Sequence, residues 1–226
     1  MKYPLPSKFK RKIYSVAERY VQQQQLAARQ DVEKAIPKYE LAEKNIANLK
    51  TLVDRTALLR HMPTAACCAE IGVNRGEFSE EILQITRPSK LHLIDMWGDP
   101  GRYNDVLKNE VEKKFATQVA SKTVEINVGR STEVLTTFPD AYFDWVYLDT
   151  DHTYKTTSEE LAILTKKMRP DGIIAGHDYV TGNFLSAFRY GVIEAVHEVC
   201  VTLGWEIIYL TIETAGPRSF AIKKIR

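Results

Sequence analysis

From about residue 65 onward, the chain alternates between short β-rich runs and helical stretches, and few folds accommodate this order. The β-rich runs lie at 66–71, 90–95, 123–128, 143–149 and 172–176. The helical stretches between them lie at about 77–87, 104–120, 131–137 and 156–168. Strands that are joined through helices pair in parallel, and the helices then cover both faces of the sheet. The pattern therefore predicts a doubly wound α/β fold.

The end of the chain departs from this alternation. We expect a helix over about 184–203, followed by two β-rich runs at 205–211 and 218–222. The short link at 213–217 contains glycine and proline, and a turn-rich link of this kind joins antiparallel strands. We therefore predict a mostly parallel sheet of seven strands whose last strand is antiparallel.

The first 60 residues differ from the rest in charge. Residues 1–60 hold 13 Lys and Arg against 6 Asp and Glu, whereas residues 61–226 hold 18 against 23. Helical apolar spacing precedes Pro37, which ends or kinks a helix. A second apolar stripe consists of Ala42, Ile46, Leu49 and Val53. We predict an N-terminal helical arm over 1–60 and a main domain over 61–226. A basic arm can bind nucleic acid, but its apolar spacing favours docking on the acidic body.

A glycine turn follows the first β-rich run and leads into a helical pattern. Its sequence is Ala69-Glu70-Ile71-Gly72-Val73-Asn74-Arg75-Gly76. Such a turn lays backbone N–H groups and a helix N-terminus against a polar small molecule. The spacing is Gly-x-x-x-Gly, which differs from the Gly-x-Gly-x-x-Gly of dinucleotide folds. The acid before the first glycine would repel a pyrophosphate and attract an ammonium or sulfonium, so the turn favours a zwitterionic or nucleoside ligand.

Polar residues or glycine follow all five predicted parallel strands, at the edge of the sheet where ligands bind. Asp95 comes 23 residues after Gly72, close to the spacing of an acid that holds ribose hydroxyls. Ser131 follows the third strand, and it can equally be the N-cap of the next helix. Two acid–histidine clusters follow the fourth and fifth strands: Asp149, Asp151 and His152, and His177 and Asp178.

The two clusters would bring several carboxylates together, and like charges so placed need a cation, a shared proton or a basic partner. Carboxylates suit Mg²⁺, Mn²⁺ or Ca²⁺, and histidine favours a transition metal. A metal there would hold substrate hydroxyls and lower their pKa. His152 titrates near neutrality and can take a hydroxyl proton. A structural salt-bridge network is the alternative.

From about residue 60 to the end, the chain resembles the class I S-adenosylmethionine-dependent methyltransferases, which have a Rossmann-like fold. Within them it is most similar to the small bacterial group called methyltransferase family 24. The motifs that carry the resemblance are Ala69 to Gly76, Leu93-Ile94-Asp95, Tyr147 to Tyr154, and Arg169 to Tyr179. The last two are specific together, whereas the first is shared by many methyltransferases.

The resemblance implies a role for each strand end. The loop with Glu70, Gly72, Asn74 and Gly76 would hold the amino-acid part of S-adenosylmethionine. Further along the sheet, the implied contacts are Asp95 with both ribose hydroxyls, Met96 or Trp97 near the adenine, Ser131 at the adenine edge and Asp149 beside the reactive methyl.

Related metal-dependent O-methyltransferases use an acid at the fourth strand end and an acidic pair at the fifth. The corresponding residues here are Asp149, His177 and Asp178, as ligands of Mg²⁺ or another divalent metal. The chain departs from both types of relative. The catechol type has Asp-Asn where this chain has Asp178-Tyr179, and the sugar type has two acids where this chain has His177-Asp178. The implied catalytic residues are Asp149, His152 and Asp178, with His152 as the base.

We predict a methyltransferase that methylates a hydroxyl oxygen of a small molecule or saccharide. The alternatives are a nicotinamide-dependent oxidoreductase, a non-catalytic cofactor-binding module and a nucleic-acid modifier. The sequence lacks the Gly-x-Gly-x-x-Gly signature of a nicotinamide-dependent oxidoreductase. It also lacks the Asn-Pro-Pro-Tyr-like run of base methyltransferases, so a small molecule or saccharide is favoured over nucleic acid as the substrate. With no apolar run of about 18 residues, no membrane span is expected. The three cysteines are expected to be free thiols, which favours a cytoplasmic protein. The N-terminal arm is a candidate contact between the two chains of a homodimer.

Overall fold

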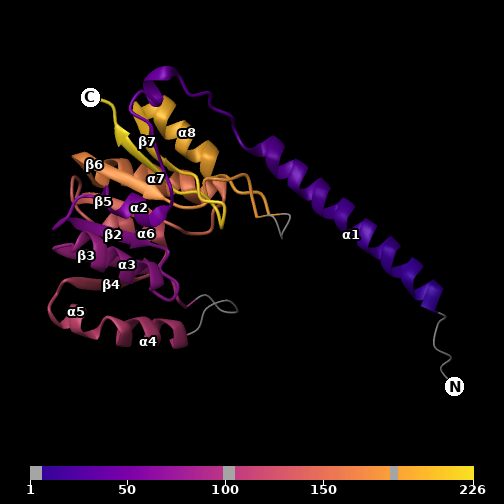
Figure 1. Ribbon diagram of the computed structural model, residues 1–226, viewed down its shortest axis with the longest axis horizontal. Coiled ribbons are helices and arrows are strands. Elements are labelled where there is room, and N and C mark those ends of the chain that lie inside the picture. Colours follow the sequence, from indigo (N-terminus) through magenta and orange to yellow (C-terminus); the bar gives the residue numbers. More distant parts are fainter. Residues whose placement is uncertain (1–6, 99–104, 184–187) are drawn as a thin grey trace.

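The computed structural model describes residues 7–98, 105–183 and 188–226. Within these ranges a single mixed sheet has the order β1-β7-β8-β6-β5-β2-β3-β4 (Figure 1). Neighbouring strands are parallel except around β8, which is antiparallel to both β6 and β7. The strands are β1 (Lys50–Leu52), β2 (Cys67–Ile71), β3 (Lys90–Asp95), β4 (Val124–Val128), β5 (Phe143–Leu148), β6 (Met168–Gly176), β7 (Trp205–Thr211) and β8 (Phe220–Lys224). The predicted doubly wound fold with an antiparallel last strand is confirmed, with eight strands in place of seven.

Helices cover both faces of the sheet, as the alternation predicted. The helices of the described ranges, of which α1 lies apart from the sheet, are α1 (Ser7–Ala35), α2 (Arg55–Leu59), α3 (Glu77–Thr86), α4 (Asp105–Lys114), α5 (Ala116–Ala120), α6 (Ser131–Thr137), α7 (Tyr154–Lys167) and α8 (Val192–Leu203), with a 3₁₀ turn η1 (Glu43–Asn45). Successive residues of a strand point to opposite faces. In β2, Ala69 therefore packs in one apolar core with Leu161 of α7. Cys68 packs in the other core with Leu59 of α2 and Ile82 of α3.

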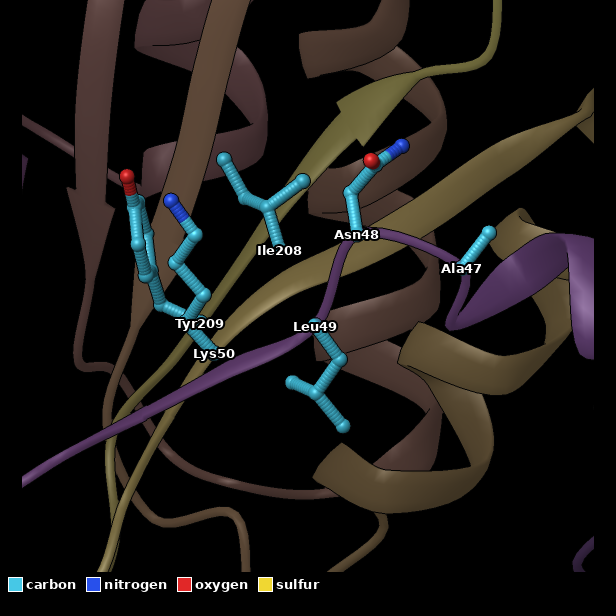
Figure 2. A pocket seen from close by; sticks show the side chains of 6 residues that line it. All are labelled: Ala47, Asn48, Leu49, Lys50, Ile208 and Tyr209. Carbon is cyan, nitrogen blue, oxygen red and sulfur yellow. The ribbon is translucent and has the colours of Figure 1, made fainter.

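The second apolar stripe, which we expected to be helical, forms η1, β1 and α2 instead. Figure 2 shows the alternation of a strand here, with Lys50 and Tyr209 side by side and Leu49 pointing away. Ile46 and Val53 are 42% and 66% exposed, so the stripe does not form one buried helix face. Pairing with the open edge of β7 outweighs the helical spacing. The division of the chain at residue 60 stays a prediction.

The first predicted helix is confirmed as α1, which ends at Ala35, two residues before Pro37. In Figure 1 this helix extends away from the sheet and its covering helices. Ion pairs fasten its C-terminal end to the body, where Glu33 contacts Arg189 and the nearby Lys38 lies 2.8 Å from Glu194. No helix in the described ranges is long and apolar enough to cross a membrane.

Two predicted helices differ from the structure. The stretch 104–120 is divided into α4 and α5 at Phe115, whose backbone leaves the helical conformation. The helix expected from residue 184 begins at Val192, and residues 184–187 lie outside the described ranges. Gly191 precedes it, and a Cβ there would lie 2.3 Å from Cα of Tyr154. Close packing against Tyr154 therefore fixes where α8 starts.

Candidate functional site

The glycine turn lies between the end of β5 and an aromatic ring. Gly72 has φ +91°, and a Cβ there would lie 1.8 Å from the carbonyl oxygen of Asp149. Gly76 has φ +70°, and its Cβ would lie 2.7 Å from the ring of Phe115. Asn74 adopts φ +53° between them. The two glycines are therefore needed both for the backbone conformation and for space.

Asp95 ties the end of β3 to this turn. One carboxylate oxygen accepts hydrogen bonds from the backbone N–H groups of Val73 and Asn74, at 2.8 and 2.9 Å. The other accepts one from the N–H of Trp97 at 3.0 Å. A carboxylate oxygen can accept two hydrogen bonds, so the second oxygen retains capacity for a hydroxyl donor. The half-buried Asp95 thus both shapes the turn and can still bind a ligand.

The residues around Asp95 differ in what they can offer a ligand. Trp97 is only 1% exposed, and its indole N–H donates to the carbonyl oxygen of Asn74 at 2.8 Å. Met96 is half-buried, and so is Ser131 at the start of α6. Met96 and Ser131 therefore have side-chain surface available, whereas Trp97 mainly braces the turn from behind.

Glu70 lies beneath the glycine turn and is 2% exposed. Its carboxyl group accepts a hydrogen bond from the hydroxyl of Ser79 on α3. Burial raises the pKa of Glu70 to about 8, against the opposing effect of the Ser79 hydrogen bond. The group is therefore protonated at neutral pH and joins β2 to α3.

This pKa gives a prediction for the variant Glu70→Gln. The folded protein holds the Glu70 proton more tightly than the unfolded chain, whose carboxyl titrates near 4.5. The resulting stability is complete below that pH and is lost as the pH rises toward 8, with a slope of at most about 1.4 kcal/mol per pH unit. Glutamine does not titrate, so urea unfolding from pH 5 to 8 should show a shallower decline for the variant. Equal slopes would contradict the assignment.

The two acid–histidine clusters meet at the ends of β5 and β6. Nδ1 of His152 lies 3.3 Å from Oδ2 of Asp178. Nδ1 of His177 lies 3.2 Å from the same oxygen and 3.8 Å from Oδ2 of Asp149. Burial raises the pKa of Asp149 well above its usual value. Burial alone would also raise the pKa of Asp178, but the His177 hydrogen bond and the charges of both histidines lower it. The pair therefore has one acid that favours a proton and one that favours a charge.

The backbone at these clusters is unusual. His152 and Asp178 have φ +62° and +57°, a region in which side-chain-bearing residues cost about 1–3 kcal/mol. The ring of Tyr190 lies 4.8 Å from that of His152, and the N–H of Gly191 donates to the His152 carbonyl oxygen at 2.8 Å. Neighbouring structure thus maintains a strained conformation that aims both side chains at one point.

Asp151 has a different role from the other acids. Its carboxylate accepts from the N–H of Thr153 at 2.9 Å and from the hydroxyl of Thr156 at 2.7 Å. It therefore supports the start of α7. The sequence interpretation also missed Arg55, whose guanidinium lies 4.6 Å from the ring centroid of Phe78 on α3. Nothing in the local sequence around Arg55 indicates this position, because the helix that carries it follows the unexpected strand β1.

All the predicted site residues lie at the carboxyl ends of adjacent strands. Reading across the sheet, β6, β5, β2, β3 and β4 carry the His177–Asp178 pair, Asp149, the glycine turn, Asp95 and Ser131. The chain order reverses between β5 and β2, and ligands of open α/β sheets bind at such a switch point. The hollow of about 340 Å³ in Figure 2 lies elsewhere, beside β1.

The segment that carries most of these strand ends is similar to a known protein family. Residues 69–179, from the glycine turn to the second acid–histidine cluster, match the model of methyltransferase family 24, described as a methyltransferase domain. Over this segment the chain is therefore similar to a methyltransferase domain. The resemblance that the sequence motifs indicated is thereby confirmed. A comparison with curated proteins finds no match.

Solved structures share the fold of this chain. Cofactor-bound Rv0187 from MTB has a TM-score of 0.58 at 17% identity, with 89% of each chain covered. A SAM-dependent methyltransferase from Aquifex aeolicus has a TM-score of 0.55 at 12% identity, covering 87% of this chain and 98% of that one. The pyocyanin biosynthetic protein PhzM has a TM-score of 0.54 at 14% identity over 72% of this chain. The match covers 51% of the length of PhzM, so the chain spans about half of that protein.

Proposed function

We propose that this methyltransferase domain transfers a methyl group from S-adenosylmethionine to a hydroxyl oxygen of a small molecule or saccharide. The observation that carries the proposal is the convergence of His152 and Asp178 beside Asp149, whose backbone contacts the glycine turn at Gly72. A proton acceptor therefore lies next to the turn that would hold the cofactor. Transfer to oxygen needs such an acceptor, because a hydroxyl must lose its proton.

The cofactor would lie across the strand ends from Asp149 to Ser131. Its amino-acid part would lie at the turn of Gly72, Asn74 and Gly76, above the buried Glu70. Asp95 would accept the ribose hydroxyls with its remaining capacity, and Met96 and Ser131 would border the adenine. Asp149 would lie near the sulfonium, whose positive charge would favour the ionised form of this carboxyl group.

The reaction requires little beyond alignment and removal of one proton, because S-adenosylmethionine supplies an activated methyl group. The acceptor oxygen forms a bond to the methyl carbon as the carbon–sulfur bond breaks, and the sulfur keeps the electron pair. His152 takes the hydroxyl proton, and Asp178 at 3.3 Å stabilises the resulting imidazolium. Precise positioning accounts for the remaining acceleration.

A divalent cation such as Mg²⁺ is the alternative to proton removal by His152, because an imidazole whose one free lone pair binds a metal cannot also take a proton. Asp149, His152 and Asp178 each offer one ligand atom, and these atoms lie within 4.8 Å of one another. This grouping contains His152 where the sequence interpretation placed His177, although His177 also contacts both acids. A bound cation would hold the substrate hydroxyl and lower its pKa. Titration with Mn²⁺ should then give a binding heat that EDTA abolishes.

The cofactor assignment is tested by S-adenosylhomocysteine binding to Asp95→Ala. We expect micromolar binding by the wild type in calorimetry and a loss of about 10- to 100-fold in the variant, since charged hydrogen bonds are worth about 1.5–3 kcal/mol. The matched control is Asp105→Ala, which removes an exposed acid at the start of α4. Absence of binding to the wild type would overturn the proposed function, and NAD(H) would be the next ligand to titrate.

We also propose that two chains associate through α1 in a reducing compartment such as the cytoplasm. Tyr14, Tyr20 and Leu26 on this helix are 66%, 63% and 56% exposed. All three cysteines are free. Sedimentation of the wild type should give the mass of a dimer, and Tyr20→Lys should shift it toward the monomer. A wild-type monomer at micromolar concentration would contradict this association.

A further inference from the structure

Arg55 is held in a fixed place on the same face of the sheet as α3, the helix that follows the glycine turn. It is the first residue of α2, and Asp54 caps this helix by accepting from the N–H of Ala57 at 2.7 Å. Leu58 and Leu59 are 0% and 1% exposed, which anchors the helix in the core. Figure 1 shows α2 against the sheet, and it packs on α3 and β7.

The guanidinium of Arg55 lies next to the turn proposed to hold the amino-acid part of the cofactor. Its carbon is 4.6 Å from the ring centroid of Phe78, the second residue of the helix that follows the turn. The Phe78 ring lies 4.4 Å from that of Tyr147, two residues before Asp149. Although burial raises the pKa of Glu70, the positive charge of Arg55 lowers it. Arg55 is therefore within electrostatic reach of this acid beneath the turn.

Arg55 differs from the other half-buried or buried cations near the site. Arg189, for example, contacts the carboxylates of Glu33 and Glu194. Within residues 7–98, 105–183 and 188–226, no carboxylate lies within 4.0 Å of the Arg55 guanidinium. The stacking on Phe78 orients the group without neutralising it. A guanidinium so oriented can bind a carboxylate through two parallel hydrogen bonds.

We propose that Arg55 binds the carboxylate of the amino-acid part of S-adenosylmethionine. The inference rests on the proposed function. The cofactor carries an ammonium, a sulfonium and a carboxylate. The acids of the site, Asp95, Asp149 and Asp178, attract the first two groups and repel the third. The carboxylate therefore needs a nearby cation, and Arg55 supplies it.

The experiment compares two adenosine ligands that differ in the amino-acid part. S-Adenosylhomocysteine carries the carboxylate, and 5′-methylthioadenosine lacks the whole amino-acid group. Both are titrated into the wild type, Arg55→Ala, Arg55→Lys and the control Arg60→Ala, which removes an exposed arginine at the end of α2. We expect Arg55→Ala to weaken S-adenosylhomocysteine binding about 10- to 100-fold and to leave methylthioadenosine binding unchanged. Arg55→Lys should lie between, because it keeps the charge without the planar fork.

The outcomes separate the inference from the function on which it rests. Equal weakening of both ligands in Arg55→Ala would overturn the inference, because Arg55 would then act through the fold or the nucleoside part. Unchanged binding of both ligands would overturn it as well. Failure of the wild type to bind either ligand would contradict the proposed function itself. Thermal unfolding of each variant identifies any misfolded protein, and Arg55→Lys then provides the comparison.

Discussion

Asp178→Asn is expected to slow methyl transfer by about 100- to 10,000-fold while leaving S-adenosylhomocysteine affinity almost unchanged. Oδ2 of Asp178 lies 3.3 Å from Nδ1 of His152 and 3.2 Å from Nδ1 of His177. Asparagine keeps the size of the side chain but removes the charge that stabilises His152 when it takes the proton. General-base assistance contributes about 10²–10⁴ to the rate. The measurement is the single-turnover rate with labelled S-adenosylmethionine and an acceptor found by screening.

The matched control is Asp151→Asn. Asp151 lies two residues after Asp149, but its carboxylate accepts from Thr153 and Thr156 at the start of α7. The control should keep the rate and cost little stability, because asparagine keeps an oxygen that can accept the hydrogen bond from Thr153. An Asp178→Asn rate equal to that of the wild type would contradict the role of the pair. Repeating both assays with EDTA shows whether a bound cation contributes to the effect.

The sequence could predict the strand ends of the site because each depends on local signals. Apolar runs of strand length are followed by glycine or acids, and parallel connection places all those ends at one edge. Asp95, Asp149 and Asp178 therefore lie at the same edge of the sheet, at the ends of β3, β5 and β6. Local signals do not carry the direction of a side chain. Trp97 was predicted near the ligand, but its side chain is only 1% exposed and donates a hydrogen bond to the turn.

Features that depend on distant contacts were not predictable in the same way. Residues 50–52 join the sheet because the edge of β7 is open for pairing. The periodicity of residues 42–61 carries no information about that edge. Arg55 reaches Phe78 as a consequence of this pairing, although 23 residues separate them. The start of α8 is likewise set by contact of Gly191 with Tyr154. Each case is decided by tertiary packing, which outweighs local propensity.

Gly72→Ala is expected to destabilise the protein by about 2–5 kcal/mol, a large share of the 5–15 kcal/mol of a typical domain. The new Cβ would lie 1.8 Å from the Asp149 carbonyl oxygen and 2.6 Å from its carbonyl carbon. The backbone cannot easily move away, because Asp149 N–H donates to Ile71 and Gly72 N–H donates to Ile94, both at 2.8 Å. A left-handed conformation costs about 1–2 kcal/mol for alanine, and overpacking adds about 1–3 kcal/mol.

Gly204→Ala separates these two contributions. Gly204 has φ +70°, comparable to the +91° of Gly72, but a Cβ there meets no atom within 4 Å. Denaturant unfolding should therefore give a loss of about 1–2 kcal/mol for Gly204→Ala, from backbone conformation alone. The excess loss in Gly72→Ala measures how firmly the turn is held against the end of β5. Equal losses in the two variants would mean that the turn moves freely, and Asp149 could then not be positioned beside a cofactor by this contact.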